Sequence, residues 1–162
     1  SIKIKYSYQL DSCKALIIPG GESTTISKLI CKARMHDSII KFSKIKPIFG
    51  ICAGMILLSS NPDTNNLKTL KVMNYYVNRN AFGSQIHSFS DKIKIKNFNS
   101  KFNAVFIRAP KIYEASSTVE VLSVYNNEPV MIKENKHICT TFHPELTDDL
   151  RVYKYFLEHI NE

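Results

Sequence analysis

Residues 50–54 read G-I-C-A-G and close an apolar run, P-I-F-G-I, at residues 47–51. A short apolar run bounded by Pro and Gly is typical of a parallel strand that is covered on both faces. Residues 53–58 continue as a second apolar stretch, which predicts a buried helix. Small residues on both sides of Cys52 permit a tight, strained turn that projects its side chain. The sequence therefore predicts an α/β fold with a sharp strand-to-helix turn at Cys52.

Strand and helix signals also alternate before this turn. Residues 15–18 (A-L-I-I) predict a second buried strand, and the apolar spacing of residues 26–33 predicts a helix after it. Ser23 or Thr24 could cap the start of that helix. Residues 2–8 alternate apolar and polar side chains, which predicts a strand exposed on one face near a sheet edge.

After the turn, residues 59–71 are rich in Asn, Pro, Asp and Thr and predict a surface loop. Further strands, several of them in antiparallel hairpins, are expected at residues 92–95, 104–107, 119–125, 130–133 and 138–142. One face of a closing helix is expected to carry Leu150, Tyr153, Leu157 and Ile160. This order predicts a single domain over residues 1–162, with a parallel βαβ core that carries an antiparallel ribbon and is closed by a terminal helix.

Composition excludes several classes of function. The formal charge of +8 is spread along the chain, so we expect no nucleic-acid binding. No apolar run is long enough to span a membrane, so we expect no membrane association. The four cysteines contain no C-x-x-C pair, which argues against a zinc knuckle and a disulfide framework. A reducing cytoplasm suits such a chain.

Cys52 has the setting of a nucleophile, because a helix N-terminus lowers the pKa of a thiol beside it. A buried structural cysteine is the alternative interpretation. A thiol nucleophile needs a base within hydrogen-bond reach and a group that orients the base. The segment H-P-E supplies both, as His143 ends a predicted strand and Glu145 can turn back toward its ring. Carboxyl ends of parallel strands share one edge, so Cys52 and His143 can meet there.

Residues 19–25 (P-G-G-E-S-T-T) predict a glycine turn between a buried strand and a helix. Backbone N–H groups in such a turn can approach a substrate and stabilise an oxyanion. A phosphate cradle is less favoured, because the Walker lysine is absent and Glu22 would repel an anion. A plain turn with a helix cap remains open for this motif alone.

With these motifs in place, the chain resembles the glutaminase subunits of pyridoxal 5'-phosphate synthase, a family of class I glutamine amidotransferases. The resemblance runs the whole length. The strings G-G-E-S-T-T, R-N-A-F-G and I-R-A-P point to the vitamin B6 branch, whereas the strand-to-helix turn at Cys52 and H-P-E indicate only a class I amidotransferase. The motifs occupy residues 17–25, 49–55, 79–83, 106–110 and 142–149.

The resemblance implies that Cys52 attacks the side-chain amide of L-glutamine, that His143 serves as acid and base, and that Glu145 orients His143. Gly21 and Ala53 would then supply the oxyanion N–H groups. The expected glutamine-binding residues are Gly21, Glu22, Ser23, Arg79, Ile107 and Arg108.

The same resemblance implies no metal and no cofactor. It implies a synthase partner, a large homo-oligomer decorated by glutaminase subunits, which receives the ammonia. The implied fold is flavodoxin-like α/β, a mostly parallel sheet flanked by helices with a small antiparallel extension. The chain begins where the family's second strand would, so the implied fold lacks the family's first strand. A glutaminase subunit of another amidotransferase and a decayed, non-catalytic binding subunit remain as alternatives.

Overall fold

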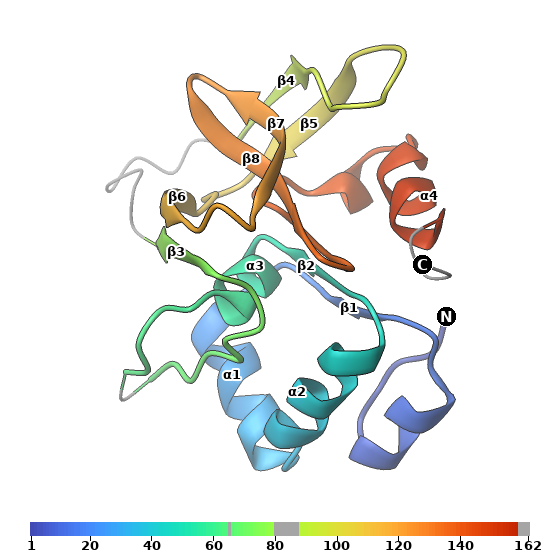
Figure 1. The fold of residues 1–162 in the computed structure, drawn as a ribbon, viewed down its shortest axis with the longest axis vertical. Helices are drawn as coiled ribbons and strands as arrows, with labels where there is room; N and C mark the ends of the chain where they lie inside the picture. The colour runs from blue at the N-terminus through green and yellow to red at the C-terminus, as the bar shows by residue number, and fades with distance from the viewer. Residues whose placement is uncertain (65, 80–87, 159–162) are drawn as a thin grey trace.

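A computed structural model describes residues 1–64, 66–79 and 88–158 of the chain. Its largest sheet has five strands in the spatial order β1 (Leu16–Ile18), β2 (Ile48–Ile51), β9 (His137–Thr140), β8 (Glu128–Glu134) and β7 (Glu120–Tyr125). β1, β2 and β9 are parallel, whereas β8 and β7 continue the sheet as an antiparallel ribbon. The predicted α/β architecture is confirmed, and β1 forms one edge of this sheet (Figure 1).

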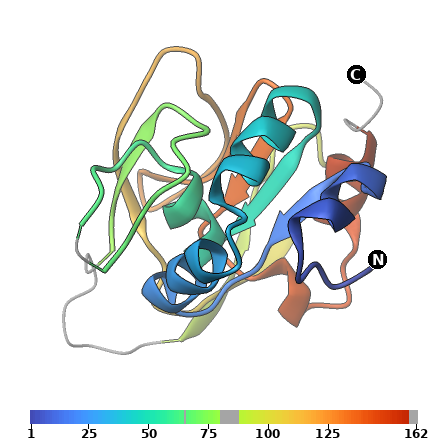
Figure 2. The same cartoon turned by 90° about the horizontal axis from the view of Figure 1, so that it is seen from below.

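Successive side chains of the central strands enter two different hydrophobic clusters, as the two-residue period of a strand requires. Ile48 and Cys139 pack with three helices, α1 (Ser23–Lys32), α2 (His36–Ile45) and α3 (Ala53–Leu58). Phe49 and Ile138 belong to the other cluster, with β4 (Phe89–Ile93), β5 (Phe102–Phe106) and the closing helix α4 (Arg151–Glu158). Figures 1 and 2 show α1 and α2 on one side of the strands and β4 and β5 on the other. The central strands are therefore covered on both faces, as their apolar runs predict.

Two smaller antiparallel sheets complete the described fold. β4 pairs with β5, and β3 (Tyr75–Asn78) pairs with β6 (Lys111–Ala115). The predicted strand at residues 92–95 lies within or directly after β4, and that at 104–107 overlaps β5. The sequence did not predict β3, β6 or α2, although the spacing of Met35, Ile39 and Phe42, all buried, is helical. No helix in the described ranges is both long and apolar enough to cross a bilayer.

The predicted edge strand at residues 2–8 is wrong. Residues up to Tyr6 have no regular structure, and a 3-10 helix, η1 (Ser7–Ser12), follows. The side-chain oxygen of Gln9 accepts hydrogen bonds from the backbone N–H groups of Lys5 (2.7 Å) and Tyr6 (2.9 Å). Because this local contact uses donors that a sheet would need, it competes with strand pairing.

Glu22, rather than Ser23 or Thr24, caps helix α1. Its carboxylate accepts hydrogen bonds from the backbone N–H groups of Thr24 (3.1 Å) and Thr25 (2.6 Å), and Ser23 is the first helical residue. A carboxylate at this position also interacts favourably with the positive end of the helix dipole. The prediction that Ser23 or Thr24 caps this helix is therefore wrong by one or two residues.

Two further predictions need correction. The described residues of segment 59–71, namely 59–64 and 66–71, form a loop without helix or named strand, but Leu67, Thr69 and Leu70 are buried, so the loop packs on the core rather than lying wholly at the surface. The closing helix forms and Tyr153 packs partly buried against the core, but the buried helix residues are Val152 and Phe156. Leu157 and Leu150, which precedes the helix, are exposed, and Ile160 lies outside the described residues.

A buried histidine makes the stability of this sheet sensitive to acid. The Nδ1 atom of His137 accepts a hydrogen bond from the Ile48 N–H at 3.1 Å, and burial lowers the pKa of His137 to about 4. Between pH 6.5 and 4 the unfolded chain therefore binds more protons than the folded protein. We expect the free energy of unfolding to fall across this window by at most about 3 kcal/mol from this residue.

Urea unfolding at pH 7 and at pH 4.5 measures this effect. His137→Asn keeps an acceptor near Ile48 and removes the titrating ring, so its pH dependence should be flatter than that of the wild type. An unchanged acid slope in His137→Asn would refute the assignment.

Candidate active site

Cys52 occupies the turn between β2 and α3 with φ 49° and ψ −97°, a conformation that non-glycine residues rarely adopt. Such strain typically costs about 1–3 kcal/mol and has to be held by the surrounding structure. Close packing at two glycines, Gly50 and Gly54, holds the Cys52 backbone in this conformation. A Cβ atom at Gly50 would lie 2.8 Å from a side-chain carbon of Leu58, and one at Gly54 would lie 2.1 Å from the backbone oxygen of Ile18. Only glycine fits at either position, and the tight turn predicted from G-I-C-A-G is present.

The Cys52 thiol is buried and donates a hydrogen bond to the backbone oxygen of Ile107 at 3.8 Å. Burial raises the pKa of Cys52 to about 11, while the Ala53 N–H at the start of α3 acts in the opposite direction. The negative charge of Glu145 raises this pKa further. The predicted lowering of the Cys52 pKa by the helix N-terminus is therefore outweighed, because desolvation destabilises the thiolate more than one N–H group stabilises it. The resting thiol is neutral at pH 7.

His143 leaves the same edge of the sheet as Cys52. Ile51 pairs with Thr140 in the parallel register of β2 and β9, and the Cys52 N–H donates to the Thr140 oxygen at 2.8 Å. His143 follows Thr140 by three residues, and its own N–H donates to the Val105 oxygen of β5 at 2.8 Å. Parallel strands thus deliver the two predicted residues to one edge, as the sequence predicts.

The imidazole of His143 is oriented by Glu145, with 2.7 Å between Nδ1 and a carboxylate oxygen. A carboxylate only accepts hydrogen bonds, so Nδ1 carries the proton in this contact. Pro144 begins the short helix η2 (Pro144–Leu146), which turns Glu145 back toward the ring. The other nitrogen, Nε2, is buried and has no hydrogen-bond partner among the described residues. This arrangement leaves Nε2 able to accept a proton.

Gly20 packs directly on the His143 ring. A Cβ atom at Gly20 would lie 2.5 Å from Cε1 and 3.0 Å from Nδ1 of that ring. Gly21 follows with φ 137°, a value that side chains other than glycine rarely allow. The glycine turn of residues 19–25 therefore borders the histidine. No sequence pattern predicts this role of Gly20, because only the fold brings it to His143.

Glu22 and Arg79, both expected to bind substrate, meet at 3.4 Å. The Glu22 carboxylate also accepts from the hydroxyls and backbone N–H groups of Thr24 and Thr25, and these bonds, led by the Thr24 hydroxyl, lower the pKa of Glu22 to about 2. Glu22 thus stays ionised, and it is exposed. Ser23, also expected at the substrate, is buried at the start of α1.

The remaining predicted residues divide by position. Ala53 is buried directly after Cys52, and the Ile107 carbonyl contacts the thiol. Arg108 follows β5, is exposed and has φ 45°. Residues 80–83 of the R-N-A-F-G string lie outside the described residues. The contacts group Cys52 with Ile107, the His143–Glu145 pair with Gly20, and Glu22 with Arg79.

Comparison with known proteins shows which family this chain belongs to. A model of the SNO glutamine amidotransferase family matches residues 1–162. The chain belongs to this family. A solved structure described as "Crystal structure of glutamine amidotransferase" is 37% identical, with a TM-score of 0.89 over 98% of this chain and 85% of that chain.

Curated members of the SNO glutamine amidotransferase family carry more specific names. The chain is 42% identical over 157 residues to the "Pyridoxal 5'-phosphate synthase subunit PdxT" of Thermosipho africanus, covering 95% of this chain and 82% of that protein. It is 45% identical over 164 residues to the protein of the same name from Methanocella arvoryzae, covering 98% of this chain and 83% of that protein. These similarities support the family resemblance stated from the sequence motifs.

The contact between Gly20 and His143 predicts the effect of adding one methyl group. Gly20→Ala should displace the His143 ring while leaving the core unchanged, since the three atoms nearest to the new one belong to that ring and to Glu145. Displacement of a reacting group by about 1 Å can cost about 100-fold in rate. We expect the release of glutamate from glutamine to fall by about this factor with little change in melting temperature. Full activity in Gly20→Ala would show that the ring does not rest on Gly20 during catalysis.

Proposed function

We propose that this protein hydrolyses L-glutamine to L-glutamate and ammonia and delivers the ammonia to a pyridoxal 5'-phosphate synthase subunit for vitamin B6 biosynthesis. The observation that carries the proposal is the oriented base: Glu145 holds Nδ1 of His143 at 2.7 Å and leaves Nε2 open. This base leaves the same sheet edge as the strained Cys52. A nucleophile, a base and an orienting carboxylate form the set that acyl transfer requires.

In the first half of the reaction, the Cys52 sulfur attacks the carbon of the glutamine side-chain amide. The thiol proton moves to Nε2 of His143, which then donates it to the nitrogen, and the C–N bond breaks to release ammonia. A thioester between Cys52 and the glutamyl group remains. Because the pKa of the resting thiol is about 11, the proton has to leave as the sulfur attacks or after the site is rearranged.

In the second half, His143 takes a proton from water as the water oxygen attacks the thioester carbon. The C–S bond breaks, the proton returns to the sulfur, and glutamate leaves. Negative charge develops on the same oxygen in both halves, and the N–H groups of Gly21 and Ala53 are the proposed donors to it. The Ala53 N–H already lies beside the Cys52 sulfur, since it lowers the pKa of that thiol.

Glutamine carries an ammonium group and a carboxylate on its α-carbon, and the proposed site offers the complementary charges. Glu22 is the proposed partner of the ammonium group, and Arg79 that of the carboxylate. Gly21, Ser23 and the segment Ile107–Arg108 complete the proposed contacts. The 3.4 Å separation of Glu22 and Arg79 supports their action on one small zwitterion.

The proposed partner is a pyridoxal 5'-phosphate synthase subunit that forms a large homo-oligomer decorated by glutaminase subunits. The names of the relatives from Thermosipho africanus and Methanocella arvoryzae support this partner. The proposed location is the cytoplasm, and the proposed reaction needs no metal, cofactor, nucleic acid or membrane.

Removing the nucleophile gives the most direct test of the mechanism. Cys52→Ala should abolish glutamate release in the presence of the synthase subunit, because no other described group can form the thioester at this edge. Cys13→Ala, Cys31→Ala and Cys139→Ala are matched controls that should retain most of the activity. Hydrolysis by Cys52→Ala at the wild-type rate would overturn the assignment of the nucleophile.

Control by the partner is the second expectation. The raised pKa of Cys52 and the thiol's bond to Ile107 describe a resting site, so the isolated subunit should be nearly silent. We propose that the partner turns the Gly20–Gly21 peptide so that its N–H group faces the oxyanion, and one such donor is worth about 100- to 1000-fold in rate. Glutamate release is measured with and without the synthase subunit.

Equal rates with and without the synthase would contradict this control. Stimulation by the synthase of a different amidotransferase would favour that alternative assignment. Binding to the synthase without any glutamate release would indicate a non-catalytic subunit.

A further inference from the structure

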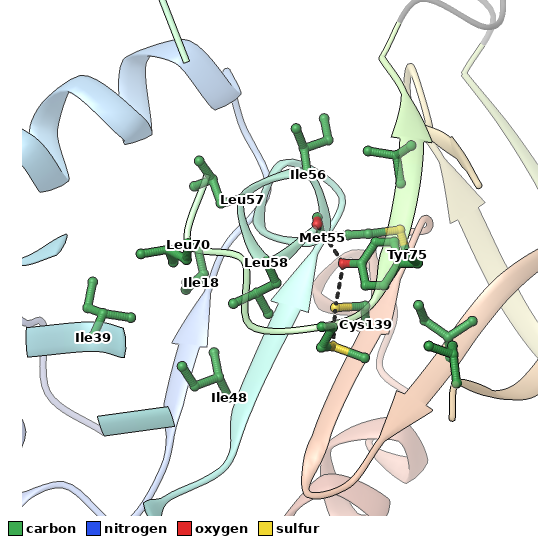
Figure 3. Close-up of a cluster of buried hydrophobic side chains, with 14 of the residues drawn as sticks. Ile18, Ile39, Ile48, Met55, Ile56, Leu57, Leu58, Leu70, Tyr75 and Cys139 are labelled. Carbon is green, nitrogen blue, oxygen red and sulfur yellow. Dashed lines mark hydrogen bonds between the residues drawn. The ribbon is translucent and has the colours of Figure 1, made fainter. Parts of the chain in front are cut away.

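The hydroxyl of Tyr75 makes two contacts in the interior of the fold. Tyr75 is fully buried, and its hydroxyl donates a hydrogen bond to the Met55 oxygen at 2.6 Å and lies 3.3 Å from the sulfur of Cys139 (Figure 3). The Cys139 sulfur in turn lies 3.6 Å from that of Met73. These contacts join a side chain of β3 to the backbone of α3 and to a side chain of β9.

Both contacts flank the turn that carries Cys52. Met55 follows Cys52 by three residues, in the first turn of α3. Cys139 is the parallel-strand partner of Gly50, which precedes Cys52 by two residues. The Tyr75 hydroxyl therefore connects the segment after the nucleophile with the neighbour of the segment before it.

Tyr75 also lies on β3, the strand that leads to Arg79 of the candidate site. β3 ends at Asn78, and Arg79, which pairs with Glu22, is the next residue. β9, which carries Cys139, leads to His143. The elements that supply the nucleophile, the base and Arg79 thus share one buried hydrogen-bonded junction, drawn in Figure 3.

The junction is not lost by ionisation. Burial raises the pKa of the Tyr75 phenol well above its usual range, and burial raises the pKa of the Cys139 thiol to about 12, so both groups stay protonated. A buried carbonyl that loses its donor is left with an unmet hydrogen bond, which a nearby backbone shift would relieve. The Met55 oxygen belongs to the same peptide unit as the Ile56 N–H, which donates to the Cys52 oxygen at 3.2 Å, so a shift of this unit reaches the strained turn.

We propose that Tyr75 is a positioning residue for Cys52: its hydrogen bond to the Met55 oxygen holds the first turn of α3 and so fixes the strained turn that presents the thiol. The proposal rests on the proposed glutaminase function for its kinetic consequence. It does not rest on that function for its effect on the thiol itself. Tyr75 does not contact substrate in this account and acts through the backbone of the turn.

Tyr75→Phe tests the proposal, because it keeps the ring and removes only the hydroxyl. In the complex with the synthase subunit, kcat for glutamate release should fall about 10-fold while KM for glutamine stays within about twofold, since the turn and not the substrate contacts is altered. Tyr76→Phe is the matched control. It removes a hydroxyl from the next residue of β3, whose ring faces Tyr113, and should leave kcat unchanged.

Alkylation by iodoacetamide, followed by peptide mass, gives a second readout that does not need turnover. Relaxation of the turn should bring the Cys52 thiol toward water, so the Tyr75→Phe protein should be alkylated at Cys52 faster and at lower pH than the wild type. Cys139 serves as the internal control, because it should stay unreactive as long as the core is closed. Cys139→Ala keeps the bond to Met55 and should retain kcat.

Each outcome of these experiments either supports or overturns the positioning role of Tyr75. Unchanged kcat and alkylation in Tyr75→Phe, equal effects in Tyr76→Phe, or joint exposure of Cys52 and Cys139 would overturn the proposal. Failure of Tyr75→Phe to fold would also overturn it, since the hydroxyl would then serve the whole fold. If the wild-type complex releases no glutamate, the proposed function fails, while the alkylation rates still test the positioning by Tyr75.

Discussion

The close packing of α3 against β1 and β2 is the constraint on which the rest of the site depends. It requires glycine at positions 50 and 54, where a Cβ atom would collide with α3 or with the backbone of Ile18. Because the two elements approach so closely, the chain between them turns within one residue, and Cys52 takes a positive φ. The parallel pairing of β2 with β9 then places His143 at the same edge. The strain at Cys52 is thus supported by packing on both sides.

The same packing raises the pKa of the proposed nucleophile. A thiol enclosed by the core loses the hydration that its anion needs, so burial dominates over the helix N-terminus in setting the pKa of Cys52. His143, by contrast, is oriented by its contact with Glu145. In the proposed mechanism, activity then depends on whatever moves the thiol or the glycine turn. Such dependence suits the proposed delivery of ammonia to a partner.

Sequence patterns predicted the buried strands, the turn at Cys52 and the His143–Glu145 segment, because these depend on local glycine, proline and apolar order. They failed where a tertiary or side-chain contact decides the structure. The alternation at residues 2–8 predicted a strand, but Gln9 takes its backbone donors. The closing helix was predicted with the wrong buried face, and the packing of Gly20 on His143 has no sequence signal of its own.

The measurement closest to the central claim is covalent labelling by a glutamine analogue that carries an electrophile in place of the side-chain amide. The complex with the synthase subunit is treated with the analogue, digested and analysed by peptide mass, with excess glutamine as competitor. The account predicts one added mass, on the peptide that contains Cys52, and its loss when glutamine competes or when His143 is replaced by Ala. Labelling at another cysteine, or labelling of Cys52 that glutamine does not slow, would contradict it.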